Sequence, residues 1–119
     1  MKLLLIEDER EVAEYVGKFL REAGFELAHA SSGAEARRHA AESRFDLILL
    51  DLVLPDILGR DLLPELKTLA PSIPVIIVSG LSFDDENLLE CLKNGAAGYV
   101  PKSSRAEELL TAVRRALRE

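Results

Sequence analysis

The sequence has a single cysteine, no tryptophan, no long apolar run and no basic surplus. Cys91 cannot form an internal disulfide, and no charged-then-apolar leader opens the sequence, so nothing indicates secretion and we expect a reducing, cytoplasmic location. The longest apolar runs, such as Leu3 to Ile6, have four residues, whereas a membrane-spanning helix needs about 20. We therefore expect no membrane span.

Acidic residues outnumber basic ones, with 21 Asp and Glu against 15 Lys and Arg and a formal net charge of -6. Nucleic-acid binding rests largely on neutralising phosphates with Lys and Arg, so we expect no direct nucleic-acid binding by this chain. No glycine has the spacing of the phosphate-cradling motifs GxxxxGK[ST] or GxGxxG. The acidic surplus instead suits a cation site.

Five short apolar runs recur at near-regular spacing, and each predicts a strand. Three of them are apolar on nearly every residue, which is typical of parallel strands covered by helices on both faces. The predicted strands are Lys2 to Ile6, Phe25 to His29, Asp46 to Leu50, Ile73 to Val78 and Gly98 to Val100.

Segments with helical signals separate and follow these strands. In the first, apolar residues recur at i, i+4, i+7 and i+8 from Val12 to Leu20, and Gly24 follows where a helix would stop. The remaining helices are predicted at Gly33 to Ser43, about Arg60 to Leu69, Asp84 or Asp85 to Lys93, and Ser104 to Arg118.

Two of these helices depend on local details. Pro64 is tolerable only in the first turn or so of the third helix, where a missing N–H has no intrahelical partner to lose. Ser103 or Ser104 is the expected N-cap of the last helix.

Strand and helix thus alternate five times, which predicts an α/β fold of three layers: a doubly wound, five-stranded parallel sheet with right-handed crossovers. The five units consume residues 1–119, so we expect one domain. Any downstream effect then has to pass through the surface of that domain.

Ligand sites in open parallel sheets lie beyond the carboxyl ends of the strands. Polar residues stand at four of those ends: Glu7 and Asp8 after the first strand, Asp51 after the third, Ser79 at the fourth and Lys102 after the fifth. Carboxylates about 4 Å apart repel by about 4 kcal/mol at an effective dielectric near 20. A divalent cation such as Mg²⁺, which prefers oxygen ligands and bridges to phosphate, offsets that repulsion.

This group of residues suits phosphoryl transfer, with Asp51 as the oxygen nucleophile and Ser79 and Lys102 as donors to phosphoryl oxygens. Asp46 flanks the same strand but at its opposite end. Taken singly, the residues have ordinary readings: Glu7 and Asp8 could cap a helix, Ser79 could begin a turn, and Lys102 could be a surface lysine.

Four motifs resemble the receiver domain of two-component response regulators over nearly the whole chain. They are Leu4-Leu-Ile-Glu-Asp-Glu9; Asp46-Leu-Ile-Leu-Leu-Asp51-Leu-Val-Leu-Pro55 followed by Gly59; Ile73-Pro-Val-Ile-Ile-Val-Ser-Gly80; and Gly95-Ala-Ala-Gly-Tyr-Val-Pro-Lys102.

The resemblance implies a flavodoxin-like fold with strand order 2-1-3-4-5 and a protein that is not a turnover enzyme. It implies a Mg²⁺ or Mn²⁺ ion held by Glu7, Asp8, Asp51 and the backbone carbonyl of Val53. Asp51 would take a phosphoryl group from a histidine of a sensor kinase or phosphotransfer protein.

In the same way, the resemblance makes Ser79 and Tyr99 switch residues. Phosphorylation would change the surface formed by the fourth helix, the fifth strand and the fifth helix, and that surface would control an output domain or protein. Tyr99 could instead be simple core packing. The arginines of the fifth helix and the acids that begin the fourth could form complementary homodimer contacts or a solvated face.

Two positions depart from the usual family pattern: Glu7 stands where Asp is commoner, and Ser103 follows Lys102 where Pro is frequent. A haloacid-dehalogenase phosphatase would need an acid at Val53, so that class is disfavoured. A receiver-like module that docks partners without phosphorylation remains the alternative function. Cys91 is expected to be a packed, inert thiol, and neither His29 nor His39 is assigned a role.

Overall fold

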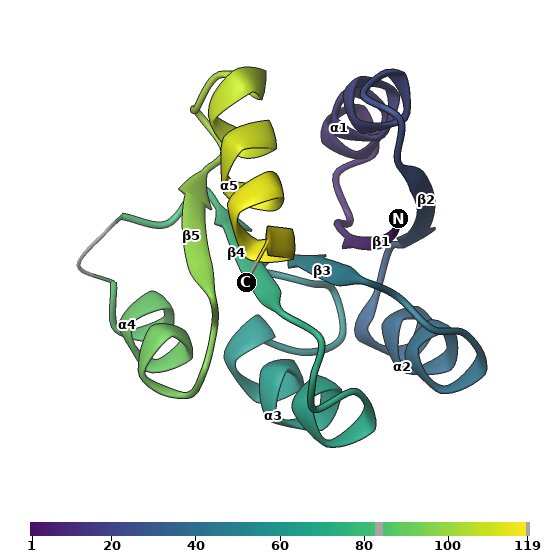
Figure 1. Cartoon of the computed structure of the whole chain (residues 1–119). Coiled ribbons are helices and arrows are strands. Elements are labelled where there is room, and N and C mark those ends of the chain that lie inside the picture. Colours follow the sequence, from purple (N-terminus) through teal and green to yellow (C-terminus); the bar gives the residue numbers. More distant parts are fainter. Residues whose placement is uncertain (83–84, 119) are drawn as a thin grey trace.

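In the computed structural model, which describes residues 1–82 and 85–118, strands and helices alternate from end to end (Figure 1). The elements are β1 (Lys2–Ile6), α1 (Arg10–Glu22), β2 (Glu26–Ala30), α2 (Gly33–Glu42), β3 (Leu47–Leu50), α3 (Gly59–Leu69), β4 (Val75–Ser79), α4 (Glu86–Lys93), β5 (Gly98–Pro101) and α5 (Ala106–Arg118). All five predicted strands are therefore present. Asp84, one of the two predicted starts of the fourth helix, lies outside the described residues.

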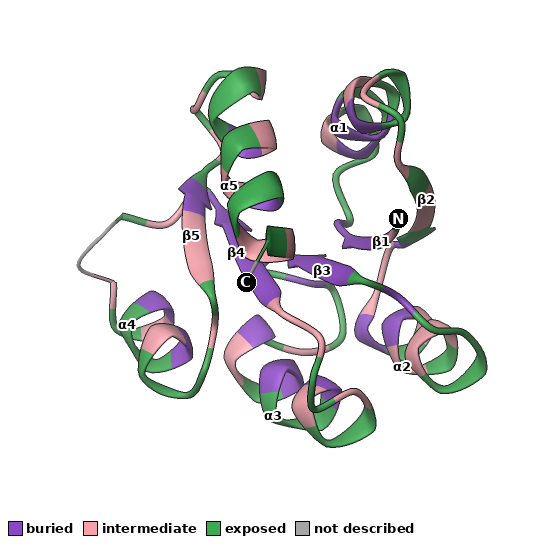
Figure 2. Ribbon diagram, viewed as in Figure 1, coloured by how far each residue is buried: buried purple, intermediate pink, exposed green. Residues whose placement is uncertain are grey.

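The five strands form one parallel sheet in the order β2-β1-β3-β4-β5. The predicted doubly wound α/β fold and its strand order are thus confirmed. Helices α1 and α5 lie on one side of the sheet, and α2, α3 and α4 lie on the other (Figure 1). The central strands β1, β3 and β4 are buried between these two helical layers, whereas the edge strands β2 and β5 are partly exposed (Figure 2).

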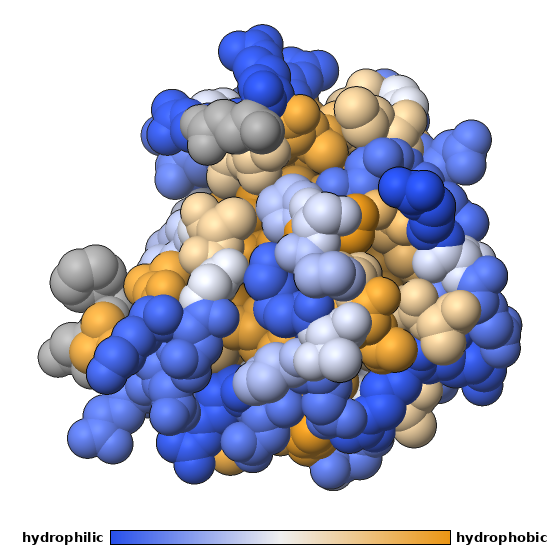
Figure 3. All heavy atoms as spheres, turned by 60° about the horizontal axis from the view of Figure 1, so that its bottom comes forward, coloured by the Kyte–Doolittle hydropathy of each residue, from blue (hydrophilic) through white to orange (hydrophobic). Residues whose placement is uncertain are grey.

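Alternate residues of each central strand enter two separate cores. In β3, Leu47 and Leu49 pack with the α1 and α5 side, whereas Ile48 and Leu50 pack with the side of α2, α3 and α4. All four are almost fully buried, which explains why this strand is apolar at every position rather than at every second one. Toward the side of α2, α3 and α4, the molecular surface consists mainly of hydrophilic residues, with hydrophobic residues in patches between them (Figure 3).

Both predictions about local helix details are wrong. Helix α3 begins at Gly59, so Pro64 falls in its second turn. The N–H of Gly59 donates to the carbonyl of Leu52. Helix α5 begins at Ala106, and the carbonyl of Arg105 accepts from the N–H groups of Glu108 and Leu109. The two serines therefore belong to the turn after β5 and not to the helix cap.

Candidate functional site

The carboxyl ends of four strands meet at one edge of the sheet. Ile6 of β1 pairs with Leu50 of β3, and Leu50 pairs with Ile77 of β4. The hydrogen bonds between strands continue just past the strand ends. The N–H of Asp51 donates to the carbonyl of Ile6 at 3.0 Å, and the N–H of Lys102 donates to the carbonyl of Ser79 at 2.9 Å. Residues just beyond the strands are thereby brought together.

Glu7, Asp8 and Asp51 form an acidic cluster in which one carboxylate oxygen of each lies within 4.8 Å of the others. Glu7 is 1% exposed and Asp51 is 4% exposed, while Asp8 faces solvent. These three predicted residues are thus close to one another. Asp46, by contrast, lies at the opposite edge, where its carboxylate accepts from Lys2 N–H at 2.7 Å.

Burial dominates the electrostatics of the two inner carboxylates. It raises the pKa of Glu7 to about 7, with a further contribution from the negative charge of Asp51 and an opposing one from the Glu9 N–H, 3.0 Å from Glu7 Oε2. Burial likewise raises the pKa of Asp51, against the charge of Lys102. A positive charge beside these two carboxylates would therefore stabilise their ionised forms.

Lys102 supplies one such charge. Its Nζ lies 3.1 Å from Glu7 Oε1, 3.2 Å from Asp51 Oδ2 and 2.6 Å from Glu9 Oε1. Burial alone would lower the pKa of Lys102, but the hydrogen bonds to Glu9 and Glu7 and the charge of Asp51 raise it well above its usual value. Lys102 is therefore a fixed ammonium at the centre of the carboxylates.

The loop after β3 is held closely against the side chain of Asp51. Asp51 Oδ1 accepts from Val53 N–H at 3.3 Å, and Val53 pairs with Leu58 in an isolated antiparallel bridge. A Cβ atom on Gly59 would lie 2.9 Å from the carbonyl oxygen of Asp51, so this close approach requires glycine. Over the site lies a hollow of about 230 Å³, lined by residues that include Asp8, Asp51, Val53, Ser79 and Lys102.

Ser79 and Tyr99 meet through a third residue. Ser79 is 1% exposed, and its Oγ accepts from Leu81 N–H at 3.0 Å. The Tyr99 hydroxyl donates to the carbonyl of Leu81 at 2.9 Å. The two predicted switch residues are thus linked, and Tyr99 also packs against the core on the side of α2, α3 and α4.

Three neighbouring residues were missed by sequence reasoning. Glu9 pairs with Lys102, His29 Nε2 lies 2.7 Å from the carbonyl oxygen of Glu7, and Asp56 caps α2 by accepting from the N–H groups of Gly33 and Ala34. Glu9 stood within a quoted motif, but nothing in the sequence linked it to Lys102.

Within the described residues there is no cis peptide bond, so the Lys102–Ser103 bond is trans.

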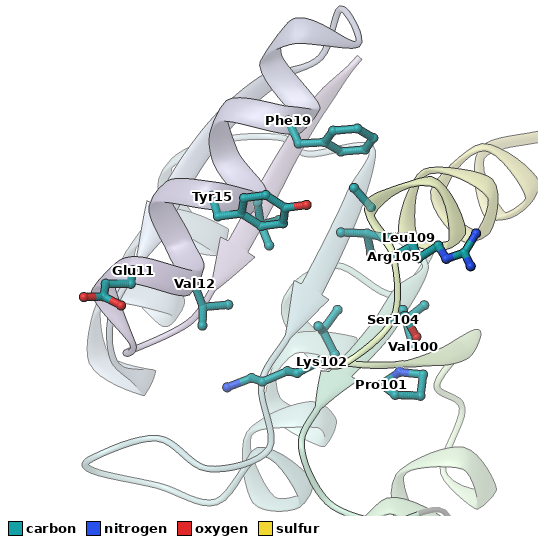
Figure 4. A pocket seen from close by; sticks show the side chains of 13 residues that line it. Glu11, Val12, Tyr15, Phe19, Val100, Pro101, Lys102, Ser104, Arg105 and Leu109 are labelled. Carbon is teal, nitrogen blue, oxygen red and sulfur yellow. The ribbon is translucent and has the colours of Figure 1, made fainter.

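A second hollow, of about 270 Å³, lies between α1 and α5 and shares Lys102 with the site (Figure 4). Its walls are mainly apolar and include Val12, Phe19 and Leu109.

Within the part of the chain that the structure describes, no helix has the length and apolar character of a membrane span.

Comparison with known proteins identifies relatives of this chain. Residues 3–114 match the family model for the response regulator receiver domain. The transcriptional regulatory protein CusR of Escherichia coli K12 is 37% identical over 118 residues, which are 99% of this chain and 52% of CusR. The chain spans about half the length of the first curated relatives that it matches.

Two solved structures extend the comparison. A CheY-like response regulator receiver domain protein from Methanospirillum hungatei JF-1 superposes with a TM-score of 0.93 at 27% identity, covering 98% of this chain and 93% of that one. A response regulator from Burkholderia pseudomallei, whose crystal structure contains a phosphorylated aspartic acid, a calcium ion and citrate, has a TM-score of 0.88 at 25% identity. That match covers 98% of this chain and 68% of the other.

Proposed function

This chain belongs to the response regulator receiver domain family, and we propose that it accepts a phosphoryl group on the carboxylate of Asp51. A domain of this family is a signalling phosphoacceptor rather than a turnover enzyme. The observation that carries the proposal is the meeting of Asp51 with two further carboxylates and one ammonium at the same edge of the sheet.

The donor set fits a divalent ion. Three carboxylates, those of Glu7, Glu9 and Asp51, contact the ammonium of Lys102, and Asp8 lies beside Glu7 and Asp51, so negative charge is in excess. We propose that Glu7, Asp8, Asp51 and the backbone carbonyl of Val53 hold Mg²⁺ or Mn²⁺. When bound, the ion would offset repulsion among the carboxylates and draw charge from phosphoryl oxygens. Two hydrogen bonds, from Glu9 N–H and Lys102 Nζ, orient the carboxylate of Glu7, whose side chain is one methylene longer than the commoner Asp.

The phosphoryl donor in this proposal is a phosphohistidine of a sensor kinase or phosphotransfer protein. A carboxylate oxygen of Asp51 attacks phosphorus, the phosphorus–nitrogen bond breaks, and its electron pair returns to the imidazole, which then takes up a proton. Lys102 donates to a phosphoryl oxygen as charge builds there. Ser79 already accepts from Leu81 N–H, and its hydroxyl has a proton to donate to a second phosphoryl oxygen.

The proposed signal leaves the site through Leu81. Movement of the Ser79 hydroxyl toward the phosphoryl group would release the N–H of Leu81, whose carbonyl holds the Tyr99 hydroxyl. The Tyr99 ring would then shift, and the surface of α4, β5 and α5 would change with it. That surface is the one we propose for an output domain or protein, or for a second copy of the chain.

We further propose that residues 1–119 act as one domain, because each of the two cores contains residues from all five strands.

Relatives about twice as long that are named transcriptional regulators support control of an output domain. Direct nucleic-acid binding is not proposed for this acidic domain. A buried free thiol, Cys91, is compatible with the proposed cytoplasmic location.

The test is phosphorylation by acetyl phosphate with Mg²⁺, followed by intact-protein mass spectrometry. We expect addition of one acid-labile phosphoryl group to the wild-type protein and none to Asp51→Asn. Asp46→Asn is the matched control, because it makes the same change at the opposite edge of the sheet and should leave phosphorylation intact. No incorporation into the wild-type protein would favour the alternative function, docking of a partner without phosphorylation.

A further inference from the structure

Three carboxylates share the ammonium of Lys102. The contact with Glu9, at 2.6 Å, is shorter than those with Glu7 and Asp51, at 3.1 and 3.2 Å. A lysine ammonium has three N–H donors and no more. Each donor therefore has a carboxylate partner in this structure, and a phosphoryl oxygen on Asp51 would have to take one donor from its present partner.

The three partners differ in how readily they can release a donor. Asp51 loses its carboxylate charge once it carries the phosphoryl group, so the donor that it holds can pass to a phosphoryl oxygen. Glu7 is 1% exposed, so leaving it without its hydrogen bond would strand a buried charge. The side chain of Glu9 is 60% exposed. Water can replace Lys102 at Glu9, so Glu9 is the partner that can release a second donor to the phosphoryl group.

The local structure of Glu9 also points toward Lys102. Glu9 occupies the N-cap of α1 with extended backbone angles (φ -77, ψ 109), yet its side chain makes no hydrogen bond to the first turn of its own helix. A short acidic residue at that position would usually accept such a bond. The carboxylate of Glu9 instead reaches a lysine that lies 93 residues later in the sequence, while its N–H orients Glu7.

We propose that Glu9 is a positioning residue that occupies one donor of Lys102 in the free domain and yields it to the incoming phosphoryl group. This inference rests on the proposed phosphorylation of Asp51. Glu9 keeps the ammonium beside the hollow, and it also competes with the phosphoryl oxygens for that ammonium. Removing its charge should consequently strengthen the binding of a phosphoryl group, whereas loss of a purely structural contact would weaken it or leave it unchanged.

The probe is beryllofluoride, a phosphoryl mimic, titrated into the whole chain at saturating Mg²⁺ and followed by backbone amide NMR. Glu9→Gln is compared with Glu11→Gln, which removes the same charge two residues later in the first turn of α1. The carboxylate of Glu11 points away from Lys102 (Figure 4). We expect the apparent Kd for beryllofluoride to fall about two- to fivefold in Glu9→Gln relative to Glu11→Gln, the range of an exposed ion pair.

Tighter binding confined to Glu9→Gln supports the inference. An equal change in both variants would mean that general charge removal is responsible, and weaker or unchanged binding in Glu9→Gln would mean that the contact is only structural; either result overturns the inference while leaving the proposed function in place. Failure of the wild-type protein to bind beryllofluoride would instead overturn the proposed function itself. Glu9→Ala repeats the test with a side chain that has no hydrogen-bond acceptor, and its affinity for beryllofluoride should rise at least as far as that of Glu9→Gln.

Discussion

The hydroxyl groups of Ser79 and Tyr99 bond to the two polar groups of one residue, Leu81. Ser79 Oγ accepts from its N–H at 3.0 Å, and its carbonyl accepts from the Tyr99 hydroxyl at 2.9 Å. Ser79 ends β4 and Tyr99 lies in the neighbouring strand β5. A single residue therefore separates the edge of the sheet that carries Asp51 from the ring of Tyr99.

Replacing Tyr99 with Phe removes the hydroxyl bond to Leu81 and keeps the ring. We expect the free energy of unfolding to fall by about 1 kcal/mol, the usual contribution of one such hydrogen bond, and the Leu81 amide to exchange faster with solvent. Urea unfolding and amide hydrogen exchange measure the two effects. Tyr15→Phe is the control, since Tyr15 is 63% exposed; equal stabilities of the two variants would contradict a role for the Tyr99 hydroxyl.

The fold was largely predictable because the central strands are apolar at consecutive positions, which indicates burial on both faces. Which strand lies beside which could not be obtained from that pattern, and the order 2-1-3-4-5 came from the family resemblance. The details that failed were local. The start of α3 depends on the close approach of Gly59 to Leu52, and the start of α5 depends on the turn that follows Lys102.

The convergence of Glu7, Asp8, Asp51, Ser79 and Lys102 was predictable because parallel strands end at a common edge. The partners of these residues were not. An exposed acid such as Glu9 usually remains solvated, and its pairing with Lys102 depends on a side-chain orientation that only coordinates supply. The cap that Asp56 provides for α2 likewise joins segments more than 20 residues apart.

Added Mg²⁺ should stabilise the folded domain, because the proposed site would bind the ion only when its carboxylates are assembled and not in the unfolded chain. At an ion concentration about 100 times the Kd, the expected gain is about 2.7 kcal/mol. Thermal unfolding with and without Mg²⁺, reversed by EDTA, measures it. Asp8→Asn should lose most of the gain, and Asp46→Asn should retain it; a gain that survives in Asp8→Asn would contradict the proposed ligand set.

Gly59→Ala tests the close contact between the loop after β3 and the start of α3. The added Cβ would lie 2.7 Å from Leu52 Cα and 2.9 Å from the carbonyl oxygen of Asp51, so backbone has to move. We expect a loss of about 1–3 kcal/mol in unfolding free energy and slower phosphorylation of Asp51. Gly98→Ala is the control, because nothing lies within 4 Å of its added Cβ. Matching stabilities in the two variants would show that the loop tolerates the methyl group.

The thiol of Cys91 should be unreactive in the folded domain. Cys91 is 1% exposed, and burial, followed by the charge of Glu90, raises its pKa to about 11, whereas an unfolded cysteine ionises near 8.5. Because the folded state retains the proton, stability should fall as pH rises from about 8.5 toward 11. The sign follows from an acid whose folded pKa lies above its unfolded one.

Two measurements check this prediction for Cys91. A disulfide reagent at pH 8 should label the native protein only as fast as it unfolds, and should label the guanidinium-unfolded protein at once. The decline of unfolding free energy between pH 8.5 and 10 should be smaller in Cys91→Ala than in the wild-type protein, because the variant lacks the titrating group. Rapid labelling of the native protein would mean that α4 opens readily, since Cys91 faces the core from that helix.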